Sequence, residues 1–519
     1  MKHTHTGCCN CGNHGVPRRS FLAAVGGSAV GGALISGCAT TGAGGDRGVL
    51  HARPTVQKKE LVIQPAFSYW IPERREKTSW RGWGDIHNME DVDREVAKIT
   101  AELAELAAKA EFPVKVLPVE KVDTMDKAKA LGQTTADLML IYAATGDLGQ
   151  IEAMISPQRY NICFVRHQSG PVYLYYETAS CRLLRKTVDE LGQPGLAPVD
   201  MVVDCQDDLL WRFRSLYALK NTVGSKIVAI GDASGWGEGG QKAPQISKDL
   251  WKLDIIPVPY PEVEKRITSA RADSALVQRT EKEAQEDLRQ AGVKLSTDVG
   301  FVMRAFLLTE VFRDLMDEAG SQAMTINNCM STIMPISETT ACLPLMLIND
   351  SGAMAFCESD FVVIPSGILL HHISGLPVFL NDPTYPHHGV ITVAHCTAPR
   401  KNDGKNLDPV EILTHYESDY GAAPKVNLKI GQTITMIDPD FNAKKWIGFR
   451  GKVVGNPFMA ICRSQSDIEI EGDCDRLAEI MVGFHWMQAY GDHRKEVGYA
   501  LRKLGIEWID ITEEKLKKA

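Results

Sequence analysis

The 519-residue chain lacks a basic region. It contains no run rich in lysine and arginine, and no basic stretch is interleaved with aromatic residues, which make up 7% of the chain. The formal net charge is −8. Because proteins that bind nucleic acid need a positively charged surface for the phosphate groups, nucleic acid is not an expected partner.

The cysteines lack the paired spacing of a disulfide framework. Of the 13 cysteines, Cys8, Cys9 and Cys11 lie near the N-terminus and Cys38 ends an apolar run. Donors of the kind found in Cys8, Cys9, Cys11 and His14 bind zinc, but these residues lie in a segment that we expect to be removed. The other cysteines are odd in number and favour small buried side chains over disulfides: Cys163, Cys181, Cys205, Cys329, Cys342, Cys357, Cys396, Cys462 and Cys474.

The N-terminal segment has the pattern of an export signal. Arg18 and Arg19 precede a run rich in glycine and alanine that ends in Ile35-Ser36-Gly37-Cys38. The pattern resembles a twin-arginine signal joined to a lipoprotein cleavage box, and the run is too short and glycine-rich for a stable membrane span. We expect residues 1–38 to be this signal and the protein to be exported to the periplasmic side, held at the membrane by a lipid on Cys38. An ordinary signal cleaved near residues 39–41 is the alternative.

The length predicts two or three domains. The chain is 44% hydrophobic and 24% charged, as in ordinary soluble globular proteins. Residues 39–57, rich in glycine, threonine and alanine at their start, are expected to form a linker. We place one α/β domain at 58–205, a second at 206–373, and a smaller β-rich domain at 374–519, where the pattern changes at Ser374-Gly375.

Apolar spacing gives the expected elements of these domains. Strands that alternate with helices favour a parallel sheet, and the alternating apolar residues of the last part favour an antiparallel one. Helices are expected over 91–110, 279–291 and 492–504. Strands are expected over 61–63, 114–116, 136–142, 161–165, 172–176, 226–230, 254–258, 390–394, 425–430, 433–437, 451–455 and 507–511.

A glycine-rich loop follows the strand expected at 226–230. It reads Gly231-Asp232-Ala233-Ser234-Gly235-Trp236-Gly237, and it lies where open α/β folds bind ligands, at the carboxyl edge of a sheet. The loop matches neither a dinucleotide fingerprint nor a P-loop. A turn that needs glycine is the main interpretation, with a substrate or subunit contact and a nucleotide site as alternatives.

Two acidic groups follow apolar runs. Glu358 and Asp360 form the first, and Asp382 belongs to the second. Carboxylates in such places are costly unless they are paired or bind a cation. His395 and His485 follow later in the chain. Two carboxylates and a histidine from separate segments can form a site for a hard divalent metal ion.

Several motifs surround these residues and follow one another in a recognisable order. They are Cys342-Leu343-Pro344-Leu345-Met346-Leu347-Ile348-Asn349-Asp350, Ala355-Phe356-Cys357-Glu358-Ser359-Asp360, Ser374-Gly375, Pro377-Val378-Phe379, Ala394-His395-Cys396-Thr397 and Phe484-His485-Trp486. Their order resembles the L-fucose isomerase and L-arabinose isomerase superfamily. The specific part of the resemblance covers about residues 329–397 and 483–511. Elsewhere only the layout agrees, which implies two Rossmann-like, doubly wound α/β domains followed by a smaller, mainly antiparallel β domain.

The resemblance implies a manganese-dependent aldose–ketose isomerase that acts on a sugar and assembles as a trimer or hexamer. Its metal ligands fall on Glu358, Asp382 and His485, and the two carboxylates are also catalytic. His395 and Trp486 are expected to contact the substrate. Oxygen ligands with one imidazole suit Mn²⁺, or Mg²⁺ as the alternative, better than zinc. A carboxylate would move a proton between C1 and C2 through a cis-enediol that the cation stabilises.

Each of these assignments has an alternative. Glu358 is also interpretable as a salt-bridged interior acid, and Asp382, which precedes a proline, as a turn residue. His485 is also interpretable as a core histidine, with His493 as a rival ligand. Asp360 is expected to support a ligand or cap a helix rather than bind metal. For the whole protein, the alternatives are a non-catalytic carbohydrate-binding lipoprotein and a metal-dependent epimerase or lyase acting on a modified sugar.

Overall fold

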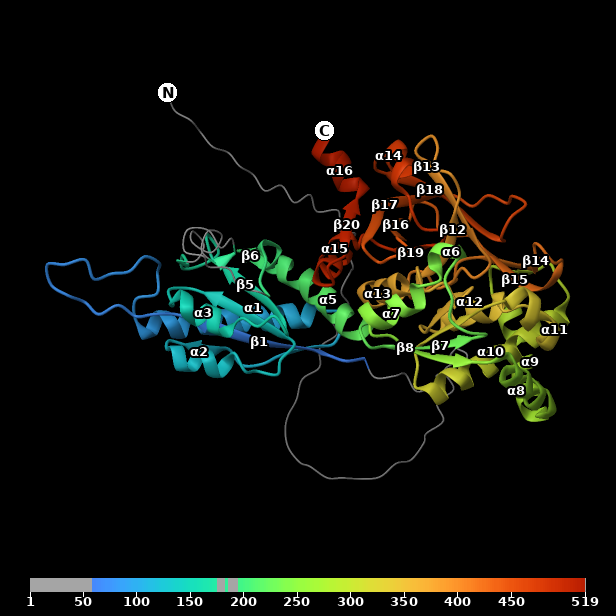
Figure 1. Ribbon diagram of the computed structural model, residues 1–519, viewed down its shortest axis with the longest axis horizontal. Coiled ribbons are helices and arrows are strands. Elements are labelled where there is room, and N and C mark those ends of the chain that lie inside the picture. Colours follow the sequence, from blue (N-terminus) through green and yellow to red (C-terminus); the bar gives the residue numbers. More distant parts are fainter. Residues whose placement is uncertain (1–57, 175–182, 185–194, 519) are drawn as a thin grey trace, which may run out of the picture. The chain divides into compact units, whose positions relative to one another are not determined.

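The computed structural model describes residues 58–174, 183–184 and 195–518 (Figure 1). The expected signal over 1–38, with Cys38, and the linker over 39–57 lie outside the described residues. Among the described residues no single helix is long and apolar enough to cross a membrane. One bent pair, Cys329–Ser337 with Cys342–Asp350, meets the length and composition criteria jointly, with 90° between its halves.

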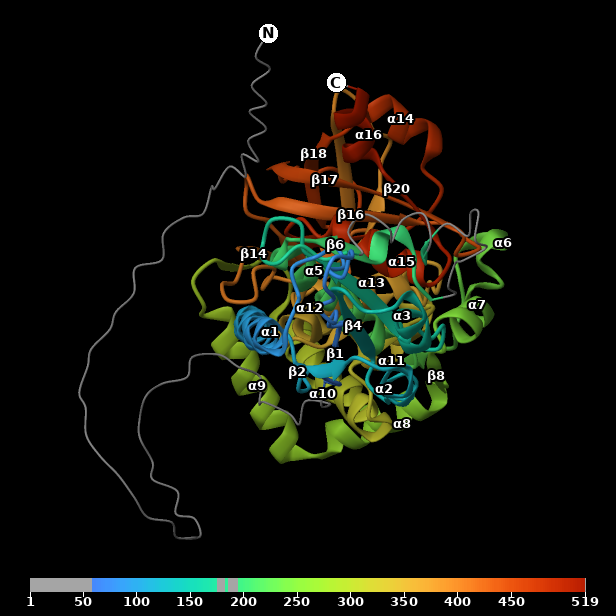
Figure 2. The same cartoon turned by 90° about the vertical axis from the view of Figure 1, so that its left-hand side faces the viewer.

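The first parallel sheet contains, in spatial order, β2 (Val114–Val116), β1 (Leu61–Ser68), β4 (Leu138–Ala143), β5 (Tyr160–Val165) and β6 (Met201–Val203), and β3 (Glu120–Val122) also pairs with β1. Its helices include α1 (Met89–Lys109), α2 (Met125–Leu131) and α3 (Leu148–Met154). Figure 2 shows α1 on one side of this sheet and α2 and α3 on the other. Because both faces are covered, every residue of β4 is buried. The strand expected at 172–176 is not formed by 172–174, and its remainder lies outside the described residues.

The second parallel sheet contains β11 (Met354–Cys357), β10 (Ala323–Ile326), β7 (Lys226–Ile230) and β8 (Asp254–Val258). Since its strands are parallel, the loops after β7 and β11 leave from the same edge. These loops carry Gly231–Gly237 and Glu358, and an isolated bridge joins Ser234 to Asp360. The helices of this part are α5 (Gln206–Thr222), α6 (Gly237–Gly240), α7 (Ala243–Leu250), α8 (Tyr260–Ala272), α9 (Ser274–Leu288), α10 (Val299–Ala319), α11 (Met334–Ser337), α12 (Cys342–Asp350) and α13 (Ile364–Ser374), with a π-helical turn at Cys329–Ile333.

The third sheet is closed. Its antiparallel strands are β16 (Thr433–Pro439), β19 (Trp486–Tyr490), β12 (Phe379–Pro383), β13 (Val390–His395), β18 (Ser464–Glu471) and β17 (Lys445–Gly455), and β16 also pairs with β17. A further strand, β20 (Glu507–Asp510), runs parallel to β17. The helices are α14 (Cys474–Ile480), α15 (Arg494–Lys503) and α16 (Ile511–Lys518). Figure 1 shows these elements in orange and red. The expectation of a mainly antiparallel β region after Ser374 is confirmed.

A three-stranded sheet links the second and third parts of the chain. β9 (Val293–Leu295) runs parallel to β14 (Val410–His415), which pairs antiparallel with β15 (Tyr420–Val426). The strand expected at 425–430 is therefore wrong in its extent. β15 ends at Val426 because Pro409, opposite Asn427, has no N–H to complete the next pair; the Asn427 N–H still donates to the Pro409 carbonyl, and the Leu428 N–H donates to the Asn456 side chain.

The structure is thus a mixed α/β protein with two parallel sheets, one closed antiparallel sheet and the small three-stranded sheet. Buried apolar side chains form three large clusters. One surrounds the first parallel sheet and continues along α13 to one face of the second sheet and to the closed sheet; another covers the other face of the second sheet; the third fills the closed sheet. Helix α13 ends at Ser374, and Gly375 caps it in the left-handed conformation (φ 67°) that glycine adopts without strain. The chain enters the closed sheet directly after this cap.

Candidate metal centre

Four polar side chains meet at the ends of strands from two sheets. Glu358 follows β11 of the second parallel sheet. Asp382 lies on β12, His395 ends β13, and His485 immediately precedes β19, all in the closed sheet. β12 pairs with both β13 and β19, and Asp382 is opposite Ala394. Antiparallel pairing therefore places Asp382 beside both histidines.

We call Glu358, Asp382, His395 and His485 the carboxylate–histidine cluster. Nε2 of His485 lies 3.2 Å from Oδ1 of Asp382 and 3.4 Å from Oε2 of Glu358. Nε2 of His395 lies 3.8 Å from Oε1 of Glu358. One donor atom each from Asp382, His395 and His485 lies within 4.8 Å of the other two. The structure thus brings together the three residues expected as metal ligands, with His395 beside them.

The cluster is buried on its histidine side and open on its carboxylate side. The His485 side chain is 0% exposed and that of His395 is 4% exposed, whereas Glu358 and Asp382 are 34% and 32% exposed. The imidazoles therefore form the floor of the cluster. A small molecule would approach over the two carboxylates.

Asp360 holds the far nitrogen of His485. Its Oδ2 lies 2.7 Å from Nδ1 of His485, and its Oδ1 accepts hydrogen bonds from the backbone N–H groups of Trp236 and Val362. Since Oδ1 is fixed by the backbone, Oδ2 holds the hydrogen of Nδ1 and turns Nε2 toward the carboxylates. This is the arrangement by which a carboxylate orients a metal-binding histidine.

The charges within the cluster control its pKa values. Burial raises the pKa of the Glu358 carboxyl group, but His395 and His485 outweigh burial and hold it well below its usual range. Burial lowers the pKa of His485, but Asp360, Asp382 and Glu358 outweigh burial and raise it to about 11. The pKa of His395 is also raised, because Glu358 and Asp382 outweigh its burial. A cation near Nε2 of His485 would replace a proton as the positive charge among the carboxylates.

Three buried atoms of the cluster have no hydrogen-bond partner within the described part of the chain. They are Oδ1 of Asp382, Nε2 of His395 and Nε2 of His485. Although Asp382 and His485 are 3.2 Å apart, their orientation does not form a hydrogen bond. Buried polar atoms without partners are costly. All three atoms lie within the ion pairs described above but make no aligned hydrogen bond, which leaves them available to a ligand.

The backbone around Glu358 has an uncommon conformation. Glu358 and Ser359 are consecutive non-glycine residues with left-handed dihedrals, φ 63° and φ 47°. The backbone N–H of Ser359 donates to the Thr325 hydroxyl, and its carbonyl accepts from the backbone N–H of Ser234. The loop after β7 therefore helps to hold Glu358 in place. This support of the cluster was not among the interpretations of the loop made from its sequence.

Two aromatic residues that were not assigned to the site from the sequence lie next to it. The rings of Trp236 and Phe484 stack with centroids 4.2 Å apart, and each also contacts the ring of His485 edge-on. Their exposed fractions are 44% and 42%. Trp236 lies in the glycine-rich loop. An aromatic residue in a loop at the carboxyl edge of a sheet is the sequence feature that could have assigned it to the site.

Two residues considered from the sequence lie apart from the cluster. Trp486 is fully buried in the core of the closed sheet, next to Phe449, and its indole N–H donates to the Gly483 carbonyl. The ring therefore has no exposed face for the substrate contact expected of it. The rival ligand His493 has its Nε2 3.0 Å from the Tyr490 carbonyl oxygen, at the start of α15.

No protein-family model matches this chain, and no curated protein matches it. The resemblance to the fucose and arabinose isomerases therefore rests on the motifs alone. The geometry of the carboxylate–histidine cluster is the independent observation that bears on function.

Proposed function

We propose that the chain is a metal-dependent aldose–ketose isomerase, similar to the fucose and arabinose isomerases, acting on a sugar through a cis-enediol. The observation that carries the proposal is the meeting of two partly exposed carboxylates with a buried imidazole. Glu358, Asp382 and His485 come from three separate segments, and Asp360 fixes the ring of His485.

The donor types agree with a hard divalent cation. Glu358, Asp382 and His485 would supply oxygen and one imidazole nitrogen, a set that suits Mn²⁺ or Mg²⁺ better than a soft metal. The unpartnered atoms of Asp382 and His485 would be satisfied by such an ion. When bound, the ion supplies Lewis-acid stabilisation for the oxygens at C1 and C2 of the sugar.

The chain's own residues would do the remaining chemistry. Glu358 is ionised at neutral pH, the form that binds a cation or accepts a proton, although its lowered pKa makes it a weaker base than an ordinary glutamate. We assign the proton transfer between C1 and C2 to Glu358 and Asp382. His395, buried beside Glu358, would orient a substrate hydroxyl. The exposed ring of Phe484, stacked on Trp236, would face the apolar side of the sugar.

The same proposal extends to the rest of the chain. The two parallel sheets would be the two Rossmann-like domains of the resembled family. The protein would be a homo-oligomer, a trimer or hexamer, as members of that family are. Export by a twin-arginine signal and anchoring through Cys38 would place the activity on the periplasmic side of a membrane.

The first test is the metal content of the purified protein, measured by mass spectrometry before and after incubation with Mn²⁺. We expect about one Mn²⁺ per chain in addition to any other metal. A panel of aldoses and ketoses in deuterated water should then show exchange of the C2 proton together with interconversion of the two sugars, as proton transfer through an enediol requires.

The matched variants are Glu358→Gln and Glu469→Gln. Glu469 is an exposed acid on β18 of the closed sheet and lies outside the cluster. Glu358→Gln should lose Mn²⁺ and exchange, and Glu469→Gln should keep both. Failure to bind Mn²⁺ after reconstitution would overturn the proposal, and tight sugar binding without exchange would favour the carbohydrate-binding lipoprotein.

A further inference from the structure

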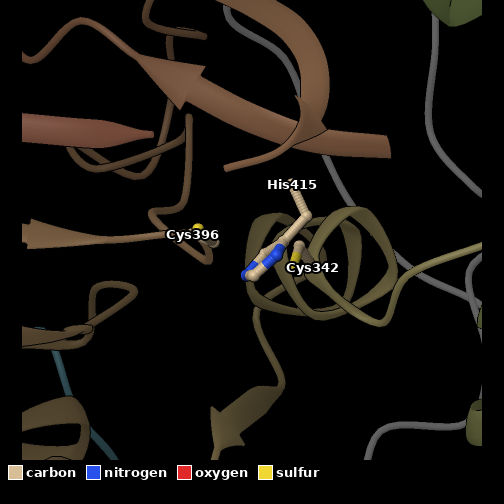
Figure 3. Close-up of side chains that lie close together, drawn as sticks. All are labelled: Cys342, Cys396 and His415. Atoms are coloured by element: carbon tan, nitrogen blue, oxygen red, sulfur yellow. The ribbon is translucent and has the colours of Figure 1, made fainter. Parts of the chain in front are cut away.

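A second group of metal-binding side chains lies outside the carboxylate–histidine cluster. We call Cys342, Cys396 and His415 the cysteine–histidine cluster. One donor atom of each lies within 4.8 Å of those of the other two, and all three residues are buried. Figure 3 shows them converging from three elements: Cys342 from the first turn of α12, Cys396 from the residue after β13, and His415 from the end of β14.

A third thiol is adjacent. Cys462 contacts the thiol of Cys396 and packs against the apolar patch formed by Cys342, Cys396 and Ala423. Cys462 is partly exposed, whereas Cys342 and Cys396 are buried. All three cysteines are free in the structure. The contact between Cys462 and Cys396 places a third sulfur beside the cluster.

The histidine of this cluster is already oriented. Nδ1 of His415 lies 3.3 Å from the hydroxyl oxygen of Ser418. With Nδ1 held by a hydroxyl group, Nε2 is the nitrogen left for a ligand. A hydrogen bond at the second ring nitrogen is a regular feature of histidines that bind metal.

We propose that Cys342, Cys396 and His415, with Cys462 as the fourth ligand, bind a zinc ion. Sulfur with one imidazole is the donor set of structural zinc sites, which are four-coordinate and closed to solvent. Binding would replace the S–H bonds with Zn–S bonds and release the thiol protons to water. The ion would tie α12, the end of β13 and β14 together.

The site would also support the first cluster. Cys396 directly follows His395 in the chain. A metal ion on Cys396 would restrict the end of β13 and therefore the position of the His395 ring. The inference does not depend on the isomerase proposal, because the cysteine–histidine cluster shares no residue with the proposed Mn²⁺ ligands.

The test uses the full chain, purified under reducing conditions and incubated with Zn²⁺ and, separately, with Mn²⁺. In the background protein Cys8, Cys9 and Cys11 are replaced by serine, so that the N-terminal thiols cannot contribute. We expect about one Zn²⁺ per chain, with sulfur neighbours at about 2.3 Å in X-ray absorption spectra. Zinc addition should also raise the melting temperature.

The variants separate the two clusters. Cys396→Ala and His415→Gln should each lose the zinc and its sulfur signal, and Cys462→Ala should weaken binding less than Cys396→Ala. Cys205→Ala, which removes an exposed thiol, and Glu358→Gln should keep the zinc. His415→Gln leaves the thiols in place, so it remains informative if Cys396→Ala does not fold.

Three outcomes would overturn the inference. The first is an absence of zinc uptake by the reduced background protein. The second is zinc retention by both Cys396→Ala and His415→Gln. The third is a zinc ion lost in Glu358→Gln, because that ion would belong to the carboxylate–histidine cluster. A failure of Mn²⁺ binding alone would overturn the proposed function and leave the zinc site standing.

Discussion

The carboxylate–histidine cluster and the cysteine–histidine cluster contain consecutive residues, His395 and Cys396, yet they offer opposite chemistry. The first presents oxygens and imidazole with carboxylates about one-third exposed, and the second presents sulfur and imidazole in a buried setting. Successive side chains of a strand point to opposite sides. The end of β13 therefore separates the proposed Mn²⁺ site from the proposed zinc site without any intervening element.

The difference in exposure indicates a difference in role. A catalytic metal site keeps an open position for the substrate, whereas a structural site is filled by protein ligands. The exposed edges of Glu358 and Asp382 leave such an opening. The buried thiols of Cys342 and Cys396, with Cys462 nearby, leave no open position for a substrate.

Loss of a ligand should affect only its own cluster. Asp382→Asn should lower Mn²⁺ affinity by more than about 100-fold, since removing even a residue that supports a ligand typically costs about 10–100-fold. The variant should keep its zinc. Cys342→Ala should lose its zinc and keep its Mn²⁺ affinity. Titration of Mn²⁺ by electron paramagnetic resonance, with zinc measured on the same samples, checks both, and joint loss of the two metals would refute the separation.

Asp360 should act as a positioning residue. In Asp360→Asn the amide group is able to donate to Nδ1 of His485, which leaves the ring hydrogen on Nε2 where the metal would bind. Mn²⁺ affinity should fall by about 10–100-fold, while sugar affinity in the absence of metal stays unchanged.

The matched control for Asp360→Asn is Asp204→Asn, which removes another carboxylate that accepts backbone hydrogen bonds, in the first part of the chain. This control should keep its Mn²⁺ affinity. Equal losses in the two variants would show that Asp360 acts only through general stability.

Mn²⁺ binding should strengthen as the pH rises. The pKa of His485 is raised to about 11, so its ring holds a proton at neutral pH, and the metal must displace that proton from Nε2. Glu358 is already ionised and releases none. Affinity should therefore rise about tenfold per pH unit up to the pKa of His485, more steeply where His395 also loses a proton.

Calorimetry in buffers of different ionisation enthalpy counts the protons released, and at pH 9 we expect about one per Mn²⁺. In the metal-free protein, the stability of the fold depends on pH in the opposite direction: it falls as the pH rises. The His485 proton stabilises the fold fully below about pH 6.5, and this stabilisation is lost as the pH rises through the folded-state pKa. Mn²⁺ binding without proton release would show that His485 is neutral in the metal-free protein.

The smallest expected effect concerns the stacked aromatic pair. Phe484→Ala should raise KM for the sugar by about 2–10-fold with kcat little changed, because a ring contact contributes roughly 0.5–1.5 kcal/mol. Phe458→Ala removes an exposed ring from the loop after β17 and should leave KM unchanged. A change in kcat rather than KM would place Phe484 in the chemical step.

Much of the fold was predictable because the spacing of apolar residues in a helix or strand, and the length of that element, are local properties of the sequence. The helix expected at 91–110 and the strands expected at 226–230 and 433–437 form close to their expected positions. The strand over 425–430 was misplaced, because its end depends on Pro409, which has no N–H to pair with Asn427, and on Asn456, and both are far from it in sequence.

Part of the candidate site was predictable from the sequence. Acidic residues after apolar runs directed attention to Glu358 and Asp382, and the structure places them together. The core position of Trp486 was not predictable, because the direction of its side chain depends on the pairing of β19 with β12. The cysteine–histidine cluster was missed because Cys342, Cys396 and His415 have no spacing that local sequence can reveal.

The left-handed backbone at Glu358 and Ser359 has a consequence for the evolution of this chain. A non-glycine residue in that conformation costs about 1–2 kcal/mol, so glycine at position 359, where the hydroxyl oxygen has no hydrogen-bond partner within the described residues, should make the protein more heat-resistant. Glycine at position 358 would also remove the carboxylate that pairs with His395 and His485. Retention of serine at 359 among homologues would therefore record selection for the site against stability.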